Sequence, residues 1–265
     1  MAVFHSIENY RYSGHIKYDR TLTMMELDVI LMEPEYQRWL MALSAPMVAL
    51  NIKYGARFCE PTFYEPGEPV SLSNSWGITS REGLISMIND MTDGGHAERL
   101  AYYYHLWHHL TASEWQHYCT NQSEDVQGAL ALVTETAALC GEGGIRAWDL
   151  GRMSFLSRIG LLNGWISEKE NLWIHTRLAD RARYYYRSWE NYYAAFLIGR
   201  TYWLTLDEED PRCQRYIFSN ASQNPDYIDQ IGTLYTHPDC PIHDLDWDVD
   251  PIEMDKPESL PEAEI

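Results

Sequence analysis

Residues 144–206 read GIRAWDLGRMSFLSRIGLLNGWISEKENLWIHTRLADRARYYYRSWENYYAAFLIGRTYWLTL. Large apolar side chains recur in this stretch every three to four residues: Trp148, Phe155, Ile159 and Leu162, and later Trp189, Tyr193, Phe196 and Trp203. Such spacing places side chains on one face of a helix. The stretch therefore predicts helices over 144–163, 168–183 and 187–205. We expect the first and last to pack together, with Gly199 allowing a close contact.

A pair of opposite charges interrupts the first apolar stripe, where Asp149 precedes Arg152 by three residues. Burying two charges costs several kcal/mol unless they are paired and hydrogen-bonded. We therefore expect the two side chains to contact each other, or one shared polar partner, between helices 144–163 and 187–205. On the same helix, Gly160 and Gly164 are four residues apart and predict a close approach by another backbone.

Capping boxes mark further helix starts, because a hydroxyl and a carboxylate three residues later satisfy each other's backbone amides. The candidate pairs are Thr79 with Glu82, Thr111 with Glu114 and Ser167 with Glu170. Together with the apolar spacing they predict helices over 80–92, 96–109, 112–120 and 124–140. No segment reads as a block of strands. The fold class expected is all-α, a single helical bundle.

The regions outside this bundle differ from it in composition. Residues 1–58 form an N-terminal segment of helical pattern, in which Pro34 and Pro46 are expected to end or kink helices. Residues 59–74 are a Pro-rich connector, and residues 75–237 are the main helical domain. Residues 238–265 are expected to form an irregular acidic tail, extended or disordered, with Trp247 and Ile252 as possible anchors in a basic groove.

The chain of 265 residues has a formal net charge of −19. Such a balance disfavours nucleic acid and anionic membranes and favours a basic protein partner. The five cysteines are scattered and include no CxxC pair, which argues against a disulfide framework. The N-terminus lacks the basic and apolar regions of a signal peptide, and no apolar run is long enough for a membrane span. We expect the protein to be cytoplasmic.

Three motifs resemble the DUF1266 family of bacterial proteins. The first, SNSWGITSREGLISMINDMTDGGH, includes Trp76 and the Gly95-His96 turn; the second, AWDLGRMSFLSRIGLLNGWISEKE, includes Trp148, Asp149 and Arg152; the third, RSWENYYAAFLIGRTYW, includes Trp189, Arg200 and Trp203. The resemblance covers roughly residues 72–206. It implies a helical, intracellular bacterial protein, and it implies no particular reaction.

Two functions from different classes fit these observations. The first is a protein-binding module, most concretely an immunity protein that neutralises a basic toxin. Its candidate binding residues are Trp148, Trp189, Arg200, Trp247, Asp246 and Asp248. The second is an enzyme whose catalytic groups would be His96, Asp149 and Arg152, because polar groups on apolar faces often mark active sites. The absence of a recognisable catalytic motif favours binding.

The sequence predicts neither a metal site nor a cofactor. His105 and His109 have the i,i+4 spacing that can share a metal, but the glutamate of an HExxH motif is missing. No GxGxxG, GxxxxGK or GxSxG motif occurs. We therefore expect aromatic packing to explain the histidine-rich run YYYHLWHHL.

Overall fold

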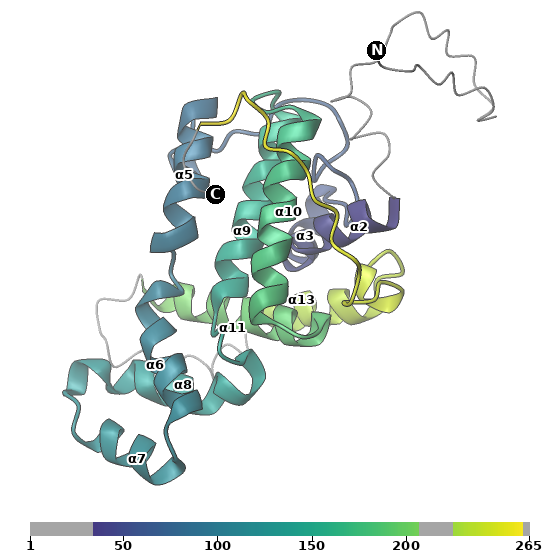
Figure 1. The fold of residues 1–265 in the computed structure, drawn as a ribbon. Coiled ribbons are helices and arrows are strands. Elements are labelled where there is room, and N and C mark those ends of the chain that lie inside the picture. The colour runs from purple at the N-terminus through teal and green to yellow at the C-terminus, as the bar shows by residue number, and fades with distance from the viewer. Residues whose placement is uncertain (1–33, 207–224, 262–265) are drawn as a thin grey trace, which may run out of the picture.

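The computed structural model describes residues 34–206 and 225–261, which form helices joined by turns (Figure 1). The elements are α2 (Pro34–Ala42), α3 (Ala45–Asn51), η1 (Ile52–Tyr54), α4 (Ser73–Trp76), α5 (Arg81–Gly94), α6 (Glu98–His109), α7 (Ala112–Thr120), α8 (Glu124–Cys140), α9 (Arg146–Leu162), α10 (Glu168–Tyr185), α11 (Trp189–Thr205), α13 (Pro225–Thr236) and η3 (Pro241–His243). Within the described ranges there is no strand, only an isolated bridge between Leu72 and Ile78. The all-α prediction is confirmed. None of the described helices combines the length and apolar character needed to cross a bilayer.

Helix α9 forms the centre of the bundle. Every residue from 147 to 160 is buried, and the helix packs against α5, α10 and α11. A helix buried on all sides must lie inside the core. The predicted packing of α9 on α11 is also confirmed: Gly199 lies against Trp148, and Gly151 lies against Phe196. Side chains at these two glycines would collide with the rings, so the two helices approach closely.

The glycines near the end of α9 do not act as predicted. Gly160 contacts the Leu84 side chain of α5 rather than another backbone. Gly164 follows the helix with a φ of +68° and has open space around it. It therefore serves the turn that ends α9, because a left-handed conformation favours glycine.

Two of the three predicted capping boxes are present, at Thr111–Glu114 and at Ser167–Glu170. The Thr79–Glu82 prediction is wrong by one residue. Ser80 is extended, and its hydroxyl accepts a hydrogen bond from the amide of Gly83. Ser80 is therefore the N-cap, and α5 begins at Arg81.

The prolines near the N-terminus begin helices and do not end them. Pro34 is the first residue of α2, and Pro46 lies in the first turn of α3. Proline is tolerated there because the first amides of a helix have no intrahelical partner. The apolar residues Met25, Ile30 and Leu31 of the predicted N-terminal pattern lie outside the described residues.

Helix α13, which the sequence analysis did not predict, packs against α3. The Gln230 amide donates a 2.6 Å hydrogen bond to the carbonyl of Pro46. Helices α2 and α3 in turn pack on α10 and α9, so residues 34–58 share one hydrophobic core with the main bundle.

Residues 238–261 are irregular, as predicted, but they are packed on the bundle. This segment, termed the strap, runs from η3 across α10 towards α5 (Figure 1). The indole Nε1 atoms of Trp39 and Trp189 donate to the carbonyls of Trp247 and Leu245, at 3.2 and 3.1 Å. At the far end, the Ser259 hydroxyl donates to Glu170 at 2.7 Å.

The Trp247 ring anchors the strap in the core. It is buried, and its centroid lies 5.3 Å from that of Trp39 and 4.8 Å from that of Trp189. Aromatic rings at such separations attract each other beyond the area that they bury. The anchor predicted for a foreign basic groove therefore occupies an aromatic pocket of its own chain.

We expect Trp247→Ala to lower the free energy of unfolding by about 3–5 kcal/mol, because it leaves a cavity between two indoles. Urea denaturation measures the effect. The control is Asp246→Ala, an exposed neighbour on the strap, with a change within about 0.5 kcal/mol. Equal stability of the two variants would show that the ring does not hold the strap.

Candidate functional site

Asp149 and Arg152 form a buried ion pair on α9, as the sequence predicts. The Arg152 Nη2 donates to Asp149 Oδ1, and the two side chains are only 9% and 6% exposed. The same Nη2 lies 2.7 Å from His96 Nδ1, in the turn between α5 and α6. Because a guanidinium only donates, Nδ1 is the acceptor here. The three residues of the candidate enzyme site are thus brought together.

The Asp149 carboxylate also caps helix α6. It accepts hydrogen bonds from the amides of His96 and Ala97, at 3.2 and 2.8 Å. Ala97 is the N-cap of α6 and offers no side-chain acceptor of its own. A carboxylate at a helix N-terminus satisfies free amides and complements the helix dipole. A Cβ on Gly95 would collide with this carboxylate, so the glycine is required by close approach.

The predicted contact between the two side chains is thus present, and their shared polar partner comes from the 95–97 turn rather than from between α9 and α11. Burial alone would raise the pKa of Asp149, but contacts with His96, the charge of Arg152 and the amide of Ala97 outweigh burial and lower it. Burial lowers the pKa of Arg152, and the Asp149 charge opposes that shift. The pair holds opposite charges at neutral pH.

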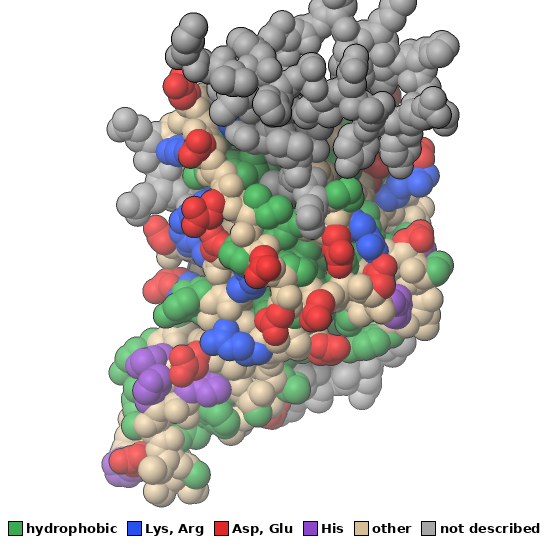
Figure 2. All heavy atoms as spheres, turned by 45° about the vertical axis from the view of Figure 1, so that its right-hand side comes forward, with side chains coloured by type: hydrophobic (Ala, Val, Ile, Leu, Met, Phe, Trp, Pro, Cys, Tyr) green, Lys and Arg blue, Asp and Glu red, His purple; other side chains and the backbone are tan. Residues whose placement is uncertain are grey.

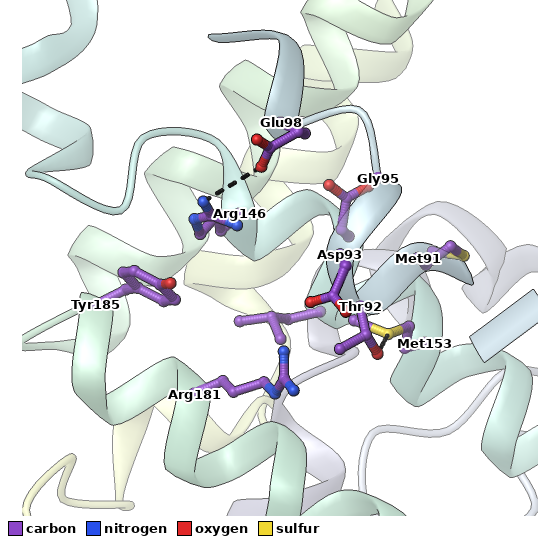
Figure 3. A pocket seen from close by; sticks show the side chains of 11 residues that line it. Met91, Thr92, Asp93, Gly95, Glu98, Arg146, Met153, Arg181 and Tyr185 are labelled. Carbon is purple, nitrogen blue, oxygen red and sulfur yellow. Dashed lines mark hydrogen bonds and ion pairs between the residues drawn. The ribbon is translucent and has the colours of Figure 1, made fainter. Parts of the chain in front are cut away.

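A small cavity lies on one side of Asp149 (Figure 3). Its volume is about 30 Å³, and residues of α5, α9 and α10 line it. Arg146 of α9 forms an ion pair with Glu98 at its mouth, at 3.6 Å. A cavity of this volume holds water but no substrate.

Arg152 lines a much larger cleft, of about 960 Å³. We term it the tryptophan cleft. It lies between α3, η1, α4, α9, α11 and α13, and its described lining residues are Met47, Ala49, Leu50, Asn51, Ile52, Lys53, Tyr54, Ser75, Trp76, Trp148, Arg152, Arg200, Trp203, Asp229, Gln230, Gly232, Thr233 and Thr236. Most ligand sites in proteins are concave and partly aromatic in this way.

One wall of the tryptophan cleft alternates indole and guanidinium groups. The Cζ atom of Arg152 lies 4.8 Å from the ring centroid of Trp148 and 5.7 Å from that of Trp76. Trp203 lies beyond Trp148, with the ring centroids 5.6 Å apart. A cation over the face of an indole is attracted by the ring's quadrupole. The motif residues Trp76, Trp148, Arg152 and Trp203, distant in sequence, meet at this wall.

The candidate binding residues fall into three places. Trp148 and Arg200 line the tryptophan cleft, Trp189 is buried against the strap residue Trp247, and Asp246 and Asp248 are exposed on the strap. Trp203 was assigned to a motif but not to a site, although it lines the cleft beside Trp148. The sequence analysis could not assign Lys53 and Gln230 to the cleft, because it did not predict η1 and α13.

A second buried polar cluster, which the sequence analysis missed, lies deeper in the core. Ser154 Oγ lies 2.9 Å from His175 Nε2 and 3.0 Å from Ser44 Oγ, and Arg158 donates to Ser44. The Ser154–His175 pair resembles the start of a catalytic triad. Because both side chains are completely buried, no substrate reaches them, and the cluster joins the turn between α2 and α3 to α9 and α10.

The histidines of α6 make local contacts. The rings of His105 and His109 lie 4.0 Å apart between centroids, and His109 Nδ1 lies 2.8 Å from the carbonyl of His105. In the part of the chain that the structure describes, no group of three or more potential ligand residues could hold a metal ion.

Two arginine–aspartate pairs with the same i,i+3 spacing, one buried and one exposed, show how burial changes the contribution of an ion pair to stability. We expect Arg152→Ala to cost about 3–5 kcal/mol of unfolding free energy, because it strands the Asp149 charge in the core. Arg177→Ala breaks the exposed Arg177–Asp180 pair and should cost about 1 kcal/mol or less. Thermal or urea denaturation compares the two. Similar costs would mean that the buried carboxylate does not depend on Arg152.

The His175 cluster predicts acid sensitivity. Burial lowers the pKa of His175 from 6.5 to about 3, so the folded protein keeps the ring neutral while the unfolded chain binds a proton. Stability from this group is complete above pH 6.5 and is lost as pH falls towards 3. Well below pH 6.5, wild-type unfolding free energy should fall by about 1.4 kcal/mol per pH unit more than that of His175→Gln. Parallel urea-denaturation profiles of both proteins at decreasing pH would contradict this.

Comparison with known proteins gives a family but no activity. The model of the family described as "Protein of unknown function (DUF1266)" matches residues 71–247, which extends past α11 to α13 and the start of the strap. Two similar proteins from Escherichia coli (strain K12) carry the names "Uncharacterized protein YbeR" and "Uncharacterized protein YbeU". The first is 38% identical over 216 residues, covering 82% of this chain and 92% of YbeR. The second is 45% identical over 179 residues, covering 68% of this chain and 76% of YbeU.

No solved structure matches the chain. The family model covers residues 71–247 of 265, and the YbeR similarity extends over most of both sequences. The resemblance seen in the three motifs is therefore confirmed. This chain belongs to the DUF1266 family.

Proposed function

We propose that this protein binds a basic protein partner through the acidic face of the strap, and that its concrete role is to neutralise a basic toxin as an immunity protein. The observation that carries the proposal is the alternation along the strap. Leu245 and Trp247 are buried in the core, whereas Asp244, Asp246 and Asp248 between and beside them are exposed.

The alternation continues further along the strap. Asp250, Glu253 and Asp255 are also exposed, so carboxylates follow one another along the outer side of a segment whose inner side is held by hydrogen bonds. Fixed carboxylates favour binding, because the partner does not have to order a flexible tail. Asp244 already pairs with Arg38 at 2.8 Å, which shows that this row accepts a guanidinium.

The wider surface supports the same kind of partner. With the right-hand side of Figure 1 turned forward, Figure 2 shows acidic side chains spread over the visible face, with basic side chains among them. The net charge of −19 adds a long-range attraction for a positively charged protein. Complementary charge speeds the encounter of two proteins and orients them before they touch.

The geometry around Asp149 supports a structural role for that residue better than a catalytic one. Its oxygens accept from two backbone amides and from Arg152, and the cavity beside it is water-sized. A general base needs a free oxygen within reach of its substrate. We keep an enzyme that uses His96, Asp149 and Arg152 as the alternative proposal.

The experiment combines co-expression and direct binding. The candidate partner is a basic toxin encoded beside this gene, and protection of growing cells is measured together with binding at low and high salt. We expect Asp246→Asn/Asp248→Asn/Asp250→Asn to lose protection and to bind at least tenfold more weakly at low salt. Binding by the wild type should weaken as salt shortens the Debye length to about 8 Å or less.

The matched control removes three exposed acids from α8 and the turn after it, as Asp125→Asn/Glu135→Gln/Glu142→Gln. It changes the net charge equally and should protect as the wild type does. Equal losses of binding and protection in both triple variants would mean that net charge, and not the position of the strap carboxylates, causes the effect. A folded Asp149→Asn protein that binds the toxin without protecting would instead favour the enzyme alternative.

A further inference from the structure

We propose that Cys59 and Cys240 form a modification site, a thiol pair that hydrogen peroxide oxidises to a disulfide between the Pro-rich connector and the strap. The site is separate from the strap carboxylates and does not rest on the binding of a partner there. Both cysteines are free in the structure, which is therefore that of the reduced protein. A reversible bond of this kind differs from the structural disulfide framework that the scattered cysteines argue against.

The segments that carry the two cysteines lie against each other. The ring centroids of Phe58 and His237 are 5.3 Å apart, and the amide of Cys240 donates to the carbonyl of His237 at 3.0 Å. Cys59 and His237 also line the same cleft, a second one of about 940 Å³. The neighbour of Cys59 in the chain therefore touches the residue to which Cys240 is hydrogen-bonded.

One arginine joins the two sides of this second cleft. Arg38 of α2 donates to the Asp244 carboxylate at 3.0 and 2.8 Å, and Cys240 and Asp244 are the residues that cap the short turn η3. The pKa of Arg38 is raised first by its hydrogen bond to Asp244 and then by one to the Cys59 side chain. The Arg38 guanidinium therefore lies between Cys59 and the turn that begins at Cys240.

The two sulfur atoms are close enough to influence each other's ionisation. Burial raises the pKa of the Cys240 thiol to about 11, and the charge of Cys59 adds to this shift more than the charge of Asp244 does. Burial likewise raises the pKa of Tyr193, and the charges of both cysteines add to that shift. The two thiols therefore share one neighbourhood, which is the arrangement of a peroxide-sensitive cysteine beside a resolving cysteine.

Cys59 is the thiol that meets the oxidant first. It is half-buried and lines the second cleft, whereas Cys240 is only 1% exposed. A second guanidinium lies near it: burial lowers the pKa of Arg158, and the charges of Cys59 and Glu60 oppose that shift. Cations beside a partly exposed sulfur stabilise the thiolate, which is the nucleophile. Arg38 and Arg158 thus offset the cost of charging a half-buried sulfur.

Two further described cysteines lack these features. Burial raises the pKa of Cys140 to about 12, and this side chain is completely buried. Cys119 on α7 is half-buried like Cys59, but burial raises its pKa and no charged side chain contributes to the shift. Cys119 is therefore the matched control for an accessible cysteine without neighbouring cations.

The oxidation has two balanced steps. The Cys59 thiolate attacks one oxygen of hydrogen peroxide, the O–O bond breaks, and the departing hydroxide takes the thiol proton to become water, which leaves Cys59 as a sulfenic acid. The Cys240 thiolate then attacks the Cys59 sulfur, the S–O bond breaks, and the second hydroxide takes the Cys240 proton. Cys240 ionises more readily at this stage, because the sulfenic acid is neutral. The thiols lose two electrons and the peroxide gains them.

The test treats the reduced full-length protein with a small molar excess of hydrogen peroxide and counts free thiols with dithionitrobenzoate. The chain has five cysteines, and we expect the wild type to lose two of its thiols. Its intact mass should fall by two hydrogens, and peptide mapping should find Cys59 joined to Cys240. Dithiothreitol should restore all the thiols.

Variants separate the two steps. Cys240→Ala should stop the reaction at the sulfenic acid of Cys59, which dimedone traps, and Cys59→Ala should lose no thiol. Cys119→Ala should form the disulfide as the wild type does. The strap variant Asp246→Asn/Asp248→Asn/Asp250→Asn should also form it, so this test and the toxin experiment fail independently. Circular dichroism melts confirm that each variant is folded.

Three results would overturn the proposal. The first is a wild-type protein that keeps all its thiols. The second is a Cys59 sulfenic acid that dimedone still traps after the reaction although Cys240 is present. The third is a disulfide that joins Cys59 to Cys213 or to a second chain instead of to Cys240.

Discussion

The carboxylate of Asp149 is the contact on which the junction between α6 and the central helix α9 depends. It joins the first amides of α6 to the centre of α9, and it leaves no room for a side chain at Gly95. It also holds Arg152 against Trp148, so one buried charge fixes a helix junction and the wall of the tryptophan cleft. The guanidinium and the two amides replace the water that the carboxylate loses on burial. These contacts offset the free-energy cost of burying its charge.

Local physics explains what the sequence could predict. The hydroxyls of Thr111 and Ser167 cap helices within three residues of themselves, so their positions are readable without knowing the fold. The helix over 112–120 has the predicted bounds for the same reason, and the helix over 124–140 also has its predicted bounds although Ser123 makes no side-chain cap hydrogen bond. The contact of Asp149 with Arg152 followed from spacing on one helix. Its third partner did not, because His96 is 53 residues away and meets the pair only after folding.

The remaining features depend on tertiary contacts. Trp247 in an acidic, Pro-containing segment has no periodic neighbours, so nothing local indicates that it enters a pocket made by Trp39 and Trp189. Helix α13 is likewise held by contacts with α3, including Gln230 with the Pro46 carbonyl. The walls of the tryptophan cleft come from α3 and α13 as well as from α9 and α11. The sequence motifs on α9 and α11 therefore could not predict the cleft by themselves.

The exposed carboxylates of the strap and the buried pair of Asp149 and Arg152 differ in the range over which their charges act. A net charge of −19 acts over roughly a Debye length, about 8 Å at physiological salt, and draws a large cationic surface towards exposed carboxylates. Around the buried pair the nearest groups dominate, because little water lies between them to screen the charges. The Arg152 charge is balanced at short range by Asp149, and the two side chains are only 9% and 6% exposed. The pair therefore serves the fold, since it satisfies a carboxylate that caps α6, while the exposed acids set the long-range field of the chain.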